Sequence, residues 1–193
     1  MHPKVYKEFE KILSQHQIQG KVLEIGAKPN KDALLTSRVL KNCQKIGINI
    51  DETGTFEDFE VVECNANDMS IFQDGEFAIV LCNAVLESDK FFWKSLQEMR
   101  RVLKTNGLLI IGVPSYKNMW FQRLSRFARG KNPISDFLSL STFTMGMHYC
   151  PSDYYRFSEE AFRDVFFAEF DEVIIKTIMA PPRTIGYSLK RSE

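Results

Sequence analysis

A short apolar run that carries an acid and ends at a glycine constrains the fold of this chain more than any other feature. Val22 and Leu23 precede Glu24, and Gly26 then breaks the strand period abruptly. A buried parallel strand that delivers its carboxyl end to a ligand in an open α/β sheet has this form. Gly26 allows the backbone to approach a ligand closely, because any side chain would occupy that space. We therefore predict that the ligand site lies beside Gly26.

The rest of the chain alternates strand patterns with helix patterns. Apolar runs predict strands, and apolar residues at intervals of three and four predict helices. Strands joined in this way by right-handed crossovers form a mostly parallel sheet with helices on both faces. The expected strands are 21–25, 45–50, 60–64, 77–81, 108–113, 172–176 and 184–189, and the expected helices are 5–18, 32–40, 91–103 and one that begins after an N-cap at Ser158.

Composition limits the classes of function. The 193 residues suffice for one domain over 1–193, and 25 basic side chains balance 25 acidic ones, which gives no argument for a nucleic-acid partner. The four cysteines form no Cys-x-x-Cys pair and the three histidines lie at no common zinc spacing, so we expect no metal site. We expect reduced thiols and a cytoplasmic protein, since the chain has no signal-peptide pattern or run of transmembrane length. The pattern specifies no oligomeric state.

Three segments resemble the class I S-adenosylmethionine-dependent methyltransferase family. Segment 22–26 reads Val-Leu-Glu-Ile-Gly, segment 77–87 reads Phe-Ala-Ile-Val-Leu-Cys-Asn-Ala-Val-Leu-Glu, and segment 98–109 reads Glu-Met-Arg-Arg-Val-Leu-Lys-Thr-Asn-Gly-Leu-Leu. The resemblance implies a Rossmann-like fold with a seven-stranded, mostly parallel sheet whose last strand is antiparallel. It implies S-adenosylmethionine as the cofactor and methyl transfer to an oxygen or nitrogen of a small molecule or a glycan precursor. Segment 148–157 also resembles a branch associated with glycan and cell-envelope gene sets.

The resemblance also implies which residues bind the cofactor. Glu24 would orient the loop after the first strand or reach the amino group of the methionine portion. The acid that holds the ribose aligns with Asn49, and Asp51, two residues further on, would point to the same side. The adenine contact falls on the pair after the third strand and the methionine contact on the residue after the fourth. The expected cofactor-binding residues are Glu24, Gly26, Ala27, Lys28, Asn49, Asp51, Asn65, Ala66 and Asn83.

Several of these positions depart from the family pattern. Lys28 and Asn30 replace glycines, Asn49 and Asn65 replace acids, and Ser88 replaces a frequent histidine. Asparagine can still hydrogen-bond a hydroxyl or an amine, whereas a lysine near a sulfonium is unfavourable unless its ammonium turns to the methionine carboxylate. The departures motivate an alternative hypothesis, a degenerate and non-catalytic binding or regulatory module. A nicotinamide-dependent oxidoreductase fits less well, because no Gly-x-Gly-x-x-Gly spacing follows the first strand.

The long segment 115–157 lacks the strand alternation, and we interpret it as a substrate or lid insertion. A hydroxyl acceptor requires a base, for which His148 is the best candidate. Asp153 or Tyr155 would orient His148, and Arg156 would hold an anionic substrate group. In the alternative interpretation, His148 caps a turn and the other three residues fix the insertion to the sheet.

Segment 118–131 supports two interpretations as a helix. Its apolar side chains share a helical face, and Arg123, Arg126 and Arg129 recur at intervals of three. A basic amphipathic helix of this kind can make peripheral contact with an anionic membrane surface. Alternatively, it is a lid helix that packs its apolar face on the domain and leaves its arginines in water.

Overall fold

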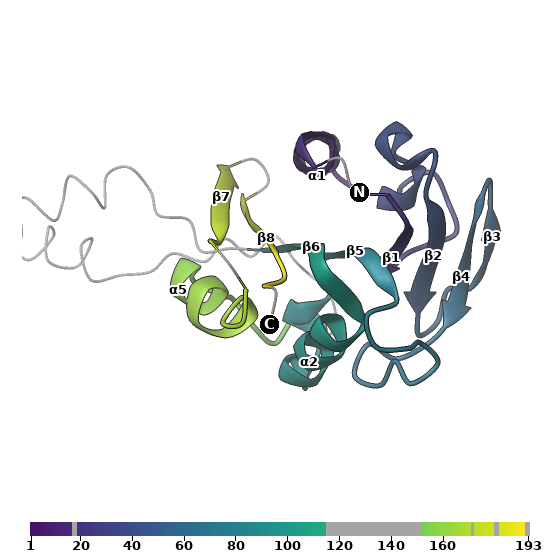
Figure 1. The fold of residues 1–193 in the computed structure, drawn as a ribbon. Helices are drawn as coiled ribbons and strands as arrows, with labels where there is room; N and C mark the ends of the chain where they lie inside the picture. The colour runs from purple at the N-terminus through teal and green to yellow at the C-terminus, as the bar shows by residue number, and fades with distance from the viewer. Residues whose placement is uncertain (17–18, 115–151, 171, 180–181, 192–193) are drawn as a thin grey trace, which may run out of the picture.

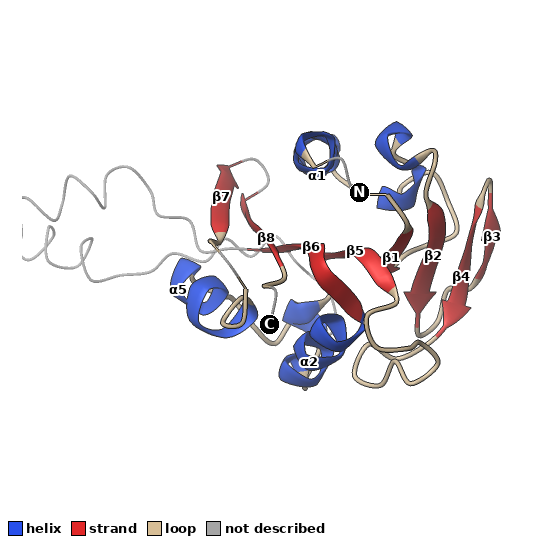
Figure 2. Ribbon diagram, viewed as in Figure 1, coloured by secondary structure: helices blue, strands red, loops and turns tan. Residues whose placement is uncertain are grey.

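The computed structural model describes residues 1–16, 19–114, 152–170, 172–179 and 182–191 of the 193. His148 and segment 118–131 lie outside these residues. Figures 1 and 2 show the arrangement of the elements. In chain order they are α1 (Pro3–Gln15), β1 (Lys21–Ile25), η1 (Leu34–Thr36), η2 (Arg38–Leu40), β2 (Gln44–Asn49), β3 (Gly54–Phe56), β4 (Phe59–Glu63), β5 (Phe77–Asn83), η3 (Leu86–Ser88), α2 (Phe92–Val102), β6 (Leu103–Pro114), α5 (Glu159–Ala161), η4 (Phe162–Phe166), β7 (Ile174–Met179) and β8 (Pro182–Leu189).

The strands form one sheet in the order β3-β4-β2-β1-β5-β6-β8-β7. Strands β4, β2, β1, β5 and β6 are parallel, and β8, the last strand of the chain, is antiparallel to β6. These pairings confirm the predicted mostly parallel α/β fold. The sheet has eight strands where seven were expected, because Gly54–Phe56 folds back in a tight hairpin that pairs Phe56 with Phe59. Three residues are too few to give a periodic signal.

Each face of the sheet carries its own apolar core. Helix α1 buries Val5, Phe9, Ile12 and Leu13 on one face, beside η1 and η2. Helix α2 and the turns that follow Ser158 cover the other face with Leu96, Met99 and a group of phenylalanines. Figure 1 shows α1 on one side of the sheet and α2 and α5 on the other. Burial of these two layers supplies the main favourable contribution to folding.

The predicted helix over 32–40 is wrong. The structure has two short 3-10 turns there, and side-chain hydroxyls explain the interruption. Thr36 Oγ1 donates to the Ala33 carbonyl at 2.7 Å, and Ser37 Oγ accepts the Val39 amide at 3.4 Å. Such local bonds compete with the helical hydrogen-bond ladder. At the other end of the chain, Ser158 Oγ accepts the Ala161 amide at 3.2 Å, which confirms the predicted N-cap.

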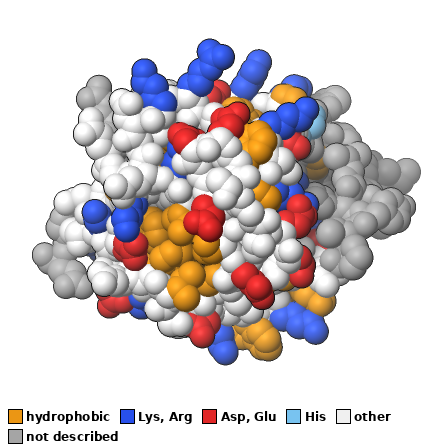
Figure 3. All heavy atoms as spheres, turned by 90° about the vertical axis from the view of Figure 1, so that its right-hand side faces the viewer, with side chains coloured by type: hydrophobic (Ala, Val, Ile, Leu, Met, Phe, Trp, Pro, Cys, Tyr) orange, Lys and Arg blue, Asp and Glu red, His pale blue; other side chains and the backbone are white. Residues whose placement is uncertain are grey.

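The β3 end of the sheet is a short edge. Figure 3 looks onto this end of the molecule and shows hydrophobic side chains grouped among acidic ones. The Phe56 and Phe59 rings pack 5.9 Å apart in the hairpin. A short edge strand limits pairing with other chains, because it presents few unpaired backbone groups. None of the helices in the described part of the chain is long and apolar enough to cross a membrane.

Candidate functional site

A cavity of about 600 Å³ opens at the carboxyl ends of β1, β2 and β4 and beside the turn after β5. Open α/β sheets bind ligands at this edge, because the loops that follow parallel strands converge there. The volume suits a ligand the size of a nucleoside derivative. The lining residues are Ile25, Gly26, Lys28, Ile48, Asn49, Ile50, Asp51, Glu52, Cys64, Asn65, Ala66, Asn67, Ala84, Val85, Ser88, Asp89, Lys90, Phe91 and Tyr154.

Gly26 lies at the cavity wall, as the first-strand pattern predicted. Its φ of 73° is in the left-handed region, and its amide donates to the Ile48 carbonyl at 2.9 Å. A Cβ atom built on Gly26 would lie 2.4 Å from Val85 Cγ2. Only glycine combines this backbone angle with this close approach. The loop after β1 therefore runs directly against the turn that follows β5.

Glu24 lies behind the loop and does not line the cavity. Its side chain is buried on the η1 face of the sheet, and its carboxylate accepts the Leu35 amide at 3.1 Å. Burial raises the pKa of Glu24 to about 7, against the opposing effect of backbone hydrogen bonds. This position fits the first of the two expected roles, orientation of the loop. Ala27 is also fully buried and contributes packing.

The Glu24 pKa predicts a pH dependence of stability. A folded-state pKa above the ordinary value means that the folded protein binds this proton more tightly than the unfolded chain. Stability should therefore fall as pH rises from about 4.5 to about 7, with a contribution of roughly 3 kcal/mol from this carboxyl. Glu24→Gln should match the parent near pH 5 and exceed its free energy of unfolding by about 2 kcal/mol at pH 8.

Denaturant unfolding of both proteins across this pH range measures the effect. Glu63→Gln, a change at an exposed glutamate, is the control and should leave the pH profile unaltered. A Glu24→Gln profile parallel to that of the parent would refute the assignment.

Asn49 connects the first two loops. Its Nδ2 donates to the Ala27 carbonyl at 2.7 Å, and its Oδ1 accepts the amides of Asp51 and Glu52 at 3.1 and 3.3 Å. The Asn49 side chain thus bonds within the protein through both its oxygen and its nitrogen. The turn that it holds brings Asp51 and Glu52 to the cavity. Sequence reasoning identified Asp51 but missed Glu52, which follows it directly.

Lys28 forms an ion pair with Glu52 at the cavity. The two side chains come from the loops after β1 and β2 and are 54% and 49% exposed. The ammonium therefore lies at the carboxylates of the second loop. Exposed pairs of this kind contribute little stability, because water screens them. The pair nevertheless sets the charge of this wall, since Lys28 offsets one of its two acids.

Polar side chains also join the loops after β4 and β5. Asn65 and Ala66 line the cavity, and Asn65 Oδ1 accepts the Asn67 amide at 2.9 Å. Asn67 Nδ2 donates to Asp89 Oδ2 and to Ser95 Oγ, both at 2.7 Å. Sequence reasoning missed Asn67 and Asp89. Asn67 lies shortly after the end of β4, which was an available signal because parallel strands end at one edge of the sheet, whereas Asp89 follows η3.

Asn83 does not line the cavity. Its Oδ1 is buried and has no hydrogen-bond partner among the described residues. A Cβ atom on Gly112 of β6 would lie 2.7 Å from this oxygen, so Asn83 points along the sheet toward β6. The expected contact of Asn83 with the methionine portion stays a prediction.

The residues expected at the acceptor side make contacts within the protein. Arg156 donates to both carboxylate oxygens of Asp153. Tyr155 Oη donates to the Lys90 carbonyl at 3.0 Å, and the amides of Tyr154 and Tyr155 donate to the Glu87 carbonyl. The Tyr154 and Tyr155 bonds tie this segment to the connection after β5, which agrees with the anchoring part of the alternative interpretation, whereas the Arg156–Asp153 bonds lie within the segment. They also place Tyr154 at the cavity.

Glu87 is a buried carboxyl that sequence reasoning missed. Its Oε1 lies 3.7 Å from Arg183 Nη1, which comes from β8. Burial raises the pKa of Glu87 to about 7, while the Arg183 charge opposes the shift. No group of three or more potential metal ligands occurs among the described residues.

Comparisons with known proteins agree with this geometry. Residues 23–111 match a family model described as a methyltransferase domain. An uncharacterized protein of Methanocaldococcus jannaschii, MJ1123, is 32% identical over 114 residues, which are 56% of this chain and 52% of that protein. The chain thus spans about half the length of this curated relative.

Solved structures show the same fold. A methyltransferase from Archaeoglobus fulgidus described as SAM-dependent superimposes with a TM-score of 0.68 at 13% identity, covering 97% of this chain and 93% of that one. The 1,6-didemethyltoxoflavin-N1-methyltransferase of Burkholderia thailandensis, solved with bound 1,6-didemethyltoxoflavin and S-adenosylhomocysteine, superimposes with a TM-score of 0.66 at 15% identity, covering 97% of this chain and 78% of that one. These similarities confirm the Rossmann-like methyltransferase fold that the sequence predicted.

Proposed function

We propose that this chain, which carries a class I methyltransferase domain, transfers a methyl group from S-adenosylmethionine to an oxygen or nitrogen of a small molecule or glycan precursor. The main observation in support of this proposal is the cavity. It lies at the carboxyl edge of the sheet, Gly26 forms one wall without a side chain, and Asp51 and Glu52 follow the second strand. The match of residues 23–111 to the methyltransferase domain supports the same cofactor.

The lining residues fit the chemical groups of this cofactor. Carboxylates at Asp51 and Glu52 are suited to accept hydrogen bonds from ribose hydroxyls. Ile50 and Ala66 offer apolar surface to the adenine, and Asn65 offers a polar edge. The bound cofactor supplies an electrophilic methyl group on a sulfonium. The protein's contribution is alignment of the acceptor with that methyl group, which lowers the entropic cost of reaction.

The acceptor side of the proposal involves segment 115–157. We assign His148 the role of base for a hydroxyl acceptor. The Asp153–Arg156 ion pair and the Tyr155 bond to Lys90 would then position the end of this segment. Segment 118–131 would either act as a lid helix or make the peripheral membrane contact, and the protein would act in the cytoplasm.

A non-catalytic binding module is the second candidate. The observation in its favour is that Asn49, at the ribose position, bonds within the protein through its Oδ1 and through Nδ2. Such a module would keep the fold but would not catalyse methyl transfer from the cofactor.

Calorimetric titration separates the two candidates. S-adenosylmethionine and S-adenosylhomocysteine should each bind the purified chain with micromolar Kd, and NAD should not bind. Absence of binding of either compound at millimolar concentration would leave only the second candidate.

From the charge of Lys28 we predict a difference in affinity between S-adenosylmethionine and S-adenosylhomocysteine. S-adenosylmethionine carries a sulfonium charge that S-adenosylhomocysteine lacks, and the Lys28 ammonium at the same cavity disfavours it. Lys28→Gln should therefore tighten S-adenosylmethionine binding about threefold relative to S-adenosylhomocysteine at low salt. The ratio of the two Kd values is the measure, because a substitution that loosens the loop and weakens both ligands equally leaves this ratio unchanged.

Glu52→Gln is the matched variant and should shift the ratio of the two Kd values in the opposite direction. The shifts should shrink at high salt, because these side chains are half exposed. A ratio that neither substitution changes would show that Lys28 does not act on the cofactor charge.

A further inference from the structure

Exposed aromatic rings gather at one rim of the cavity. Phe91, Trp93 and Tyr154 are 49%, 45% and 45% exposed, and they are the exposed large aromatic side chains among the described residues. Phe91 and Tyr154 line the cavity, and the Trp93 ring contacts Phe91 edge-on at 5.7 Å. Aromatic rings left in water beside a cavity mark a surface that a ligand can cover. We call Lys90, Phe91, Trp93, Lys94 and Tyr154 the aromatic rim.

The aromatic rim is positively charged. Lys90 Nζ lies 5.5 Å from the centre of the Tyr154 ring, and Lys94 Nζ lies 5.3 Å from that of Phe91. Neither lysine forms an ion pair with a carboxylate in the part of the chain that the structure describes. Cation–π contacts hold the two ammonium groups near the rings and leave their charge available to an anion.

Asp89, which precedes Lys90 in the chain, forms hydrogen bonds within the protein. Asp89 Oδ2 accepts hydrogen bonds from Asn67 and Ser95, and Asp89 Oδ1 accepts the Phe91 amide at 2.8 Å. Asp89 therefore holds the rim in shape through three hydrogen bonds. Asp89 keeps its negative charge, and the two positive charges of Lys90 and Lys94 outweigh it at the ring faces.

We propose that the aromatic rim is the acceptor subsite and that it takes a planar aromatic compound with an anionic group. The ligand ring would stack on Phe91 and Tyr154, and its carboxylate or phosphate would meet Lys90 and Lys94. This inference rests on the proposed methyltransferase function, since it names the acceptor class of the same site. Stacking and charge together distinguish this class from neutral and from saturated compounds.

Three matched probes test the proposal, each titrated against the chain saturated with S-adenosylhomocysteine. The probes are 6-hydroxy-2-naphthoate, its neutral amide and its fully saturated carboxylate. The naphthoate should bind with a Kd of about 1 mM or lower. The amide and the saturated acid should each bind at least about fivefold more weakly, because one lacks the charge and the other the aromatic ring.

Variants assign the binding to the rim. Tyr154→Leu should weaken naphthoate binding about fivefold, and Lys94→Gln should weaken the naphthoate without affecting the amide. Ile71→Ser and Lys41→Gln, changes at exposed residues outside the cavity lining, are the controls and should have no effect. S-adenosylhomocysteine affinity should be unchanged in Lys94→Gln and in the two controls, because none of these three residues lines the cavity.

The outcomes separate this inference from the proposed function. Equal binding of the three probes, or displacement of S-adenosylhomocysteine by the naphthoate, would overturn the acceptor subsite while cofactor binding stands. Preferential binding of glucose 1-phosphate over the naphthoate would replace the aromatic class with a sugar phosphate and would also overturn it. If the chain binds the naphthoate as described but not S-adenosylhomocysteine, the rim stands as a ligand site and the methyltransferase function fails.

Discussion

Gly26→Ala is expected to abolish cofactor binding, with at least about a hundredfold loss of S-adenosylhomocysteine affinity. The new methyl group would lie 2.4 Å from Val85 Cγ2, far inside contact distance. Val85 also lines the cavity, so any shift that relieves the collision changes the cavity wall. The φ of 73° adds strain for any residue other than glycine. We expect the free energy of unfolding to fall by about 2–4 kcal/mol.

Two further variants separate strain from collision. Gly75 also has a positive φ, 61°, but a Cβ atom there would meet nothing nearer than 3.9 Å. Gly75→Ala should therefore cost about 1 kcal/mol and leave cofactor affinity unchanged. Val85→Ala in the Gly26→Ala background should restore part of the affinity, since Val85 Cβ itself lies at an ordinary 3.8 Å. If Gly26→Ala is folded and binds S-adenosylhomocysteine like the parent, the cavity is not the cofactor site.

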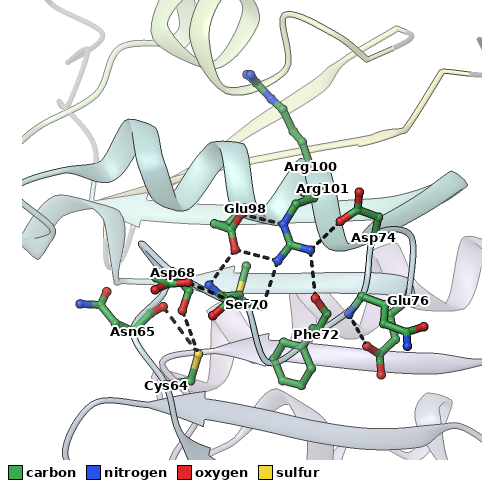
Figure 4. A network of polar contacts seen from close by, with 12 residues as sticks. Cys64, Asn65, Asp68, Ser70, Phe72, Asp74, Glu76, Glu98, Arg100 and Arg101 are labelled. Atoms are coloured by element: carbon green, nitrogen blue, oxygen red, sulfur yellow. Dashed lines mark hydrogen bonds and ion pairs between the residues drawn. The ribbon is translucent and has the colours of Figure 1, made fainter.

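Arg101→Ala is expected to lower the free energy of unfolding by about 3–4 kcal/mol. Figure 4 shows the guanidinium of this α2 residue reaching across to the connection between β4 and β5. It donates to the carbonyls of Met69 and Phe72, both at 2.9 Å, and to the carboxylates of Asp74 and Glu98. Glu98 in turn accepts the Met69 amide at 2.7 Å. Removal of Arg101 leaves the part-buried acceptors, the two carbonyls and the Glu98 carboxylate, without this donor, whereas Asp74 is exposed.

The same substitution should weaken S-adenosylhomocysteine binding about tenfold, because the connection held by Arg101 also carries the cavity residues Asn65, Ala66 and Asn67. Arg101→Lys should recover only part of both losses, since an ammonium cannot reproduce the planar fork of a guanidinium. Arg38→Ala, at an exposed arginine on the opposite face, is the control. Thermal unfolding and calorimetry measure the two effects. An affinity unchanged at a temperature where Arg101→Ala is fully folded would show that the network serves stability alone.

The sequence predicted the parts of this site that depend on local pattern. The strand before Gly26 and the apolar strand after Glu76 lie where the pattern placed them, because strand alternation and a required glycine are visible in a few neighbouring residues. The helix expected over 32–40 failed, because the hydroxyls of Thr36 and Ser37 bond the backbone in ways that apolar spacing does not reveal.

Side-chain roles at the site depended on partners from other strands. Asn49, the residue expected at the ribose, lines the cavity and also bonds the Ala27 carbonyl and the Asp51 amide. Lys28 was expected near the methionine, yet it pairs with Glu52. In both cases the partner comes from a different loop, and single-strand patterns carry no information on how loops from separate strands meet.

The sequence by itself determined the α/β architecture, the chain order of the five parallel strands and the position of the cavity beside Gly26, since these follow from periodicity and from backbone freedom within short segments. Only the tertiary structure decided which groups face the ligand. Convergence of the loops at the carboxyl edge placed Glu52 and Asn67 at the cavity and brought Tyr154 beside Phe91, residues far apart in the chain. Their proximity is a property of packing, which joins segments that share no local pattern.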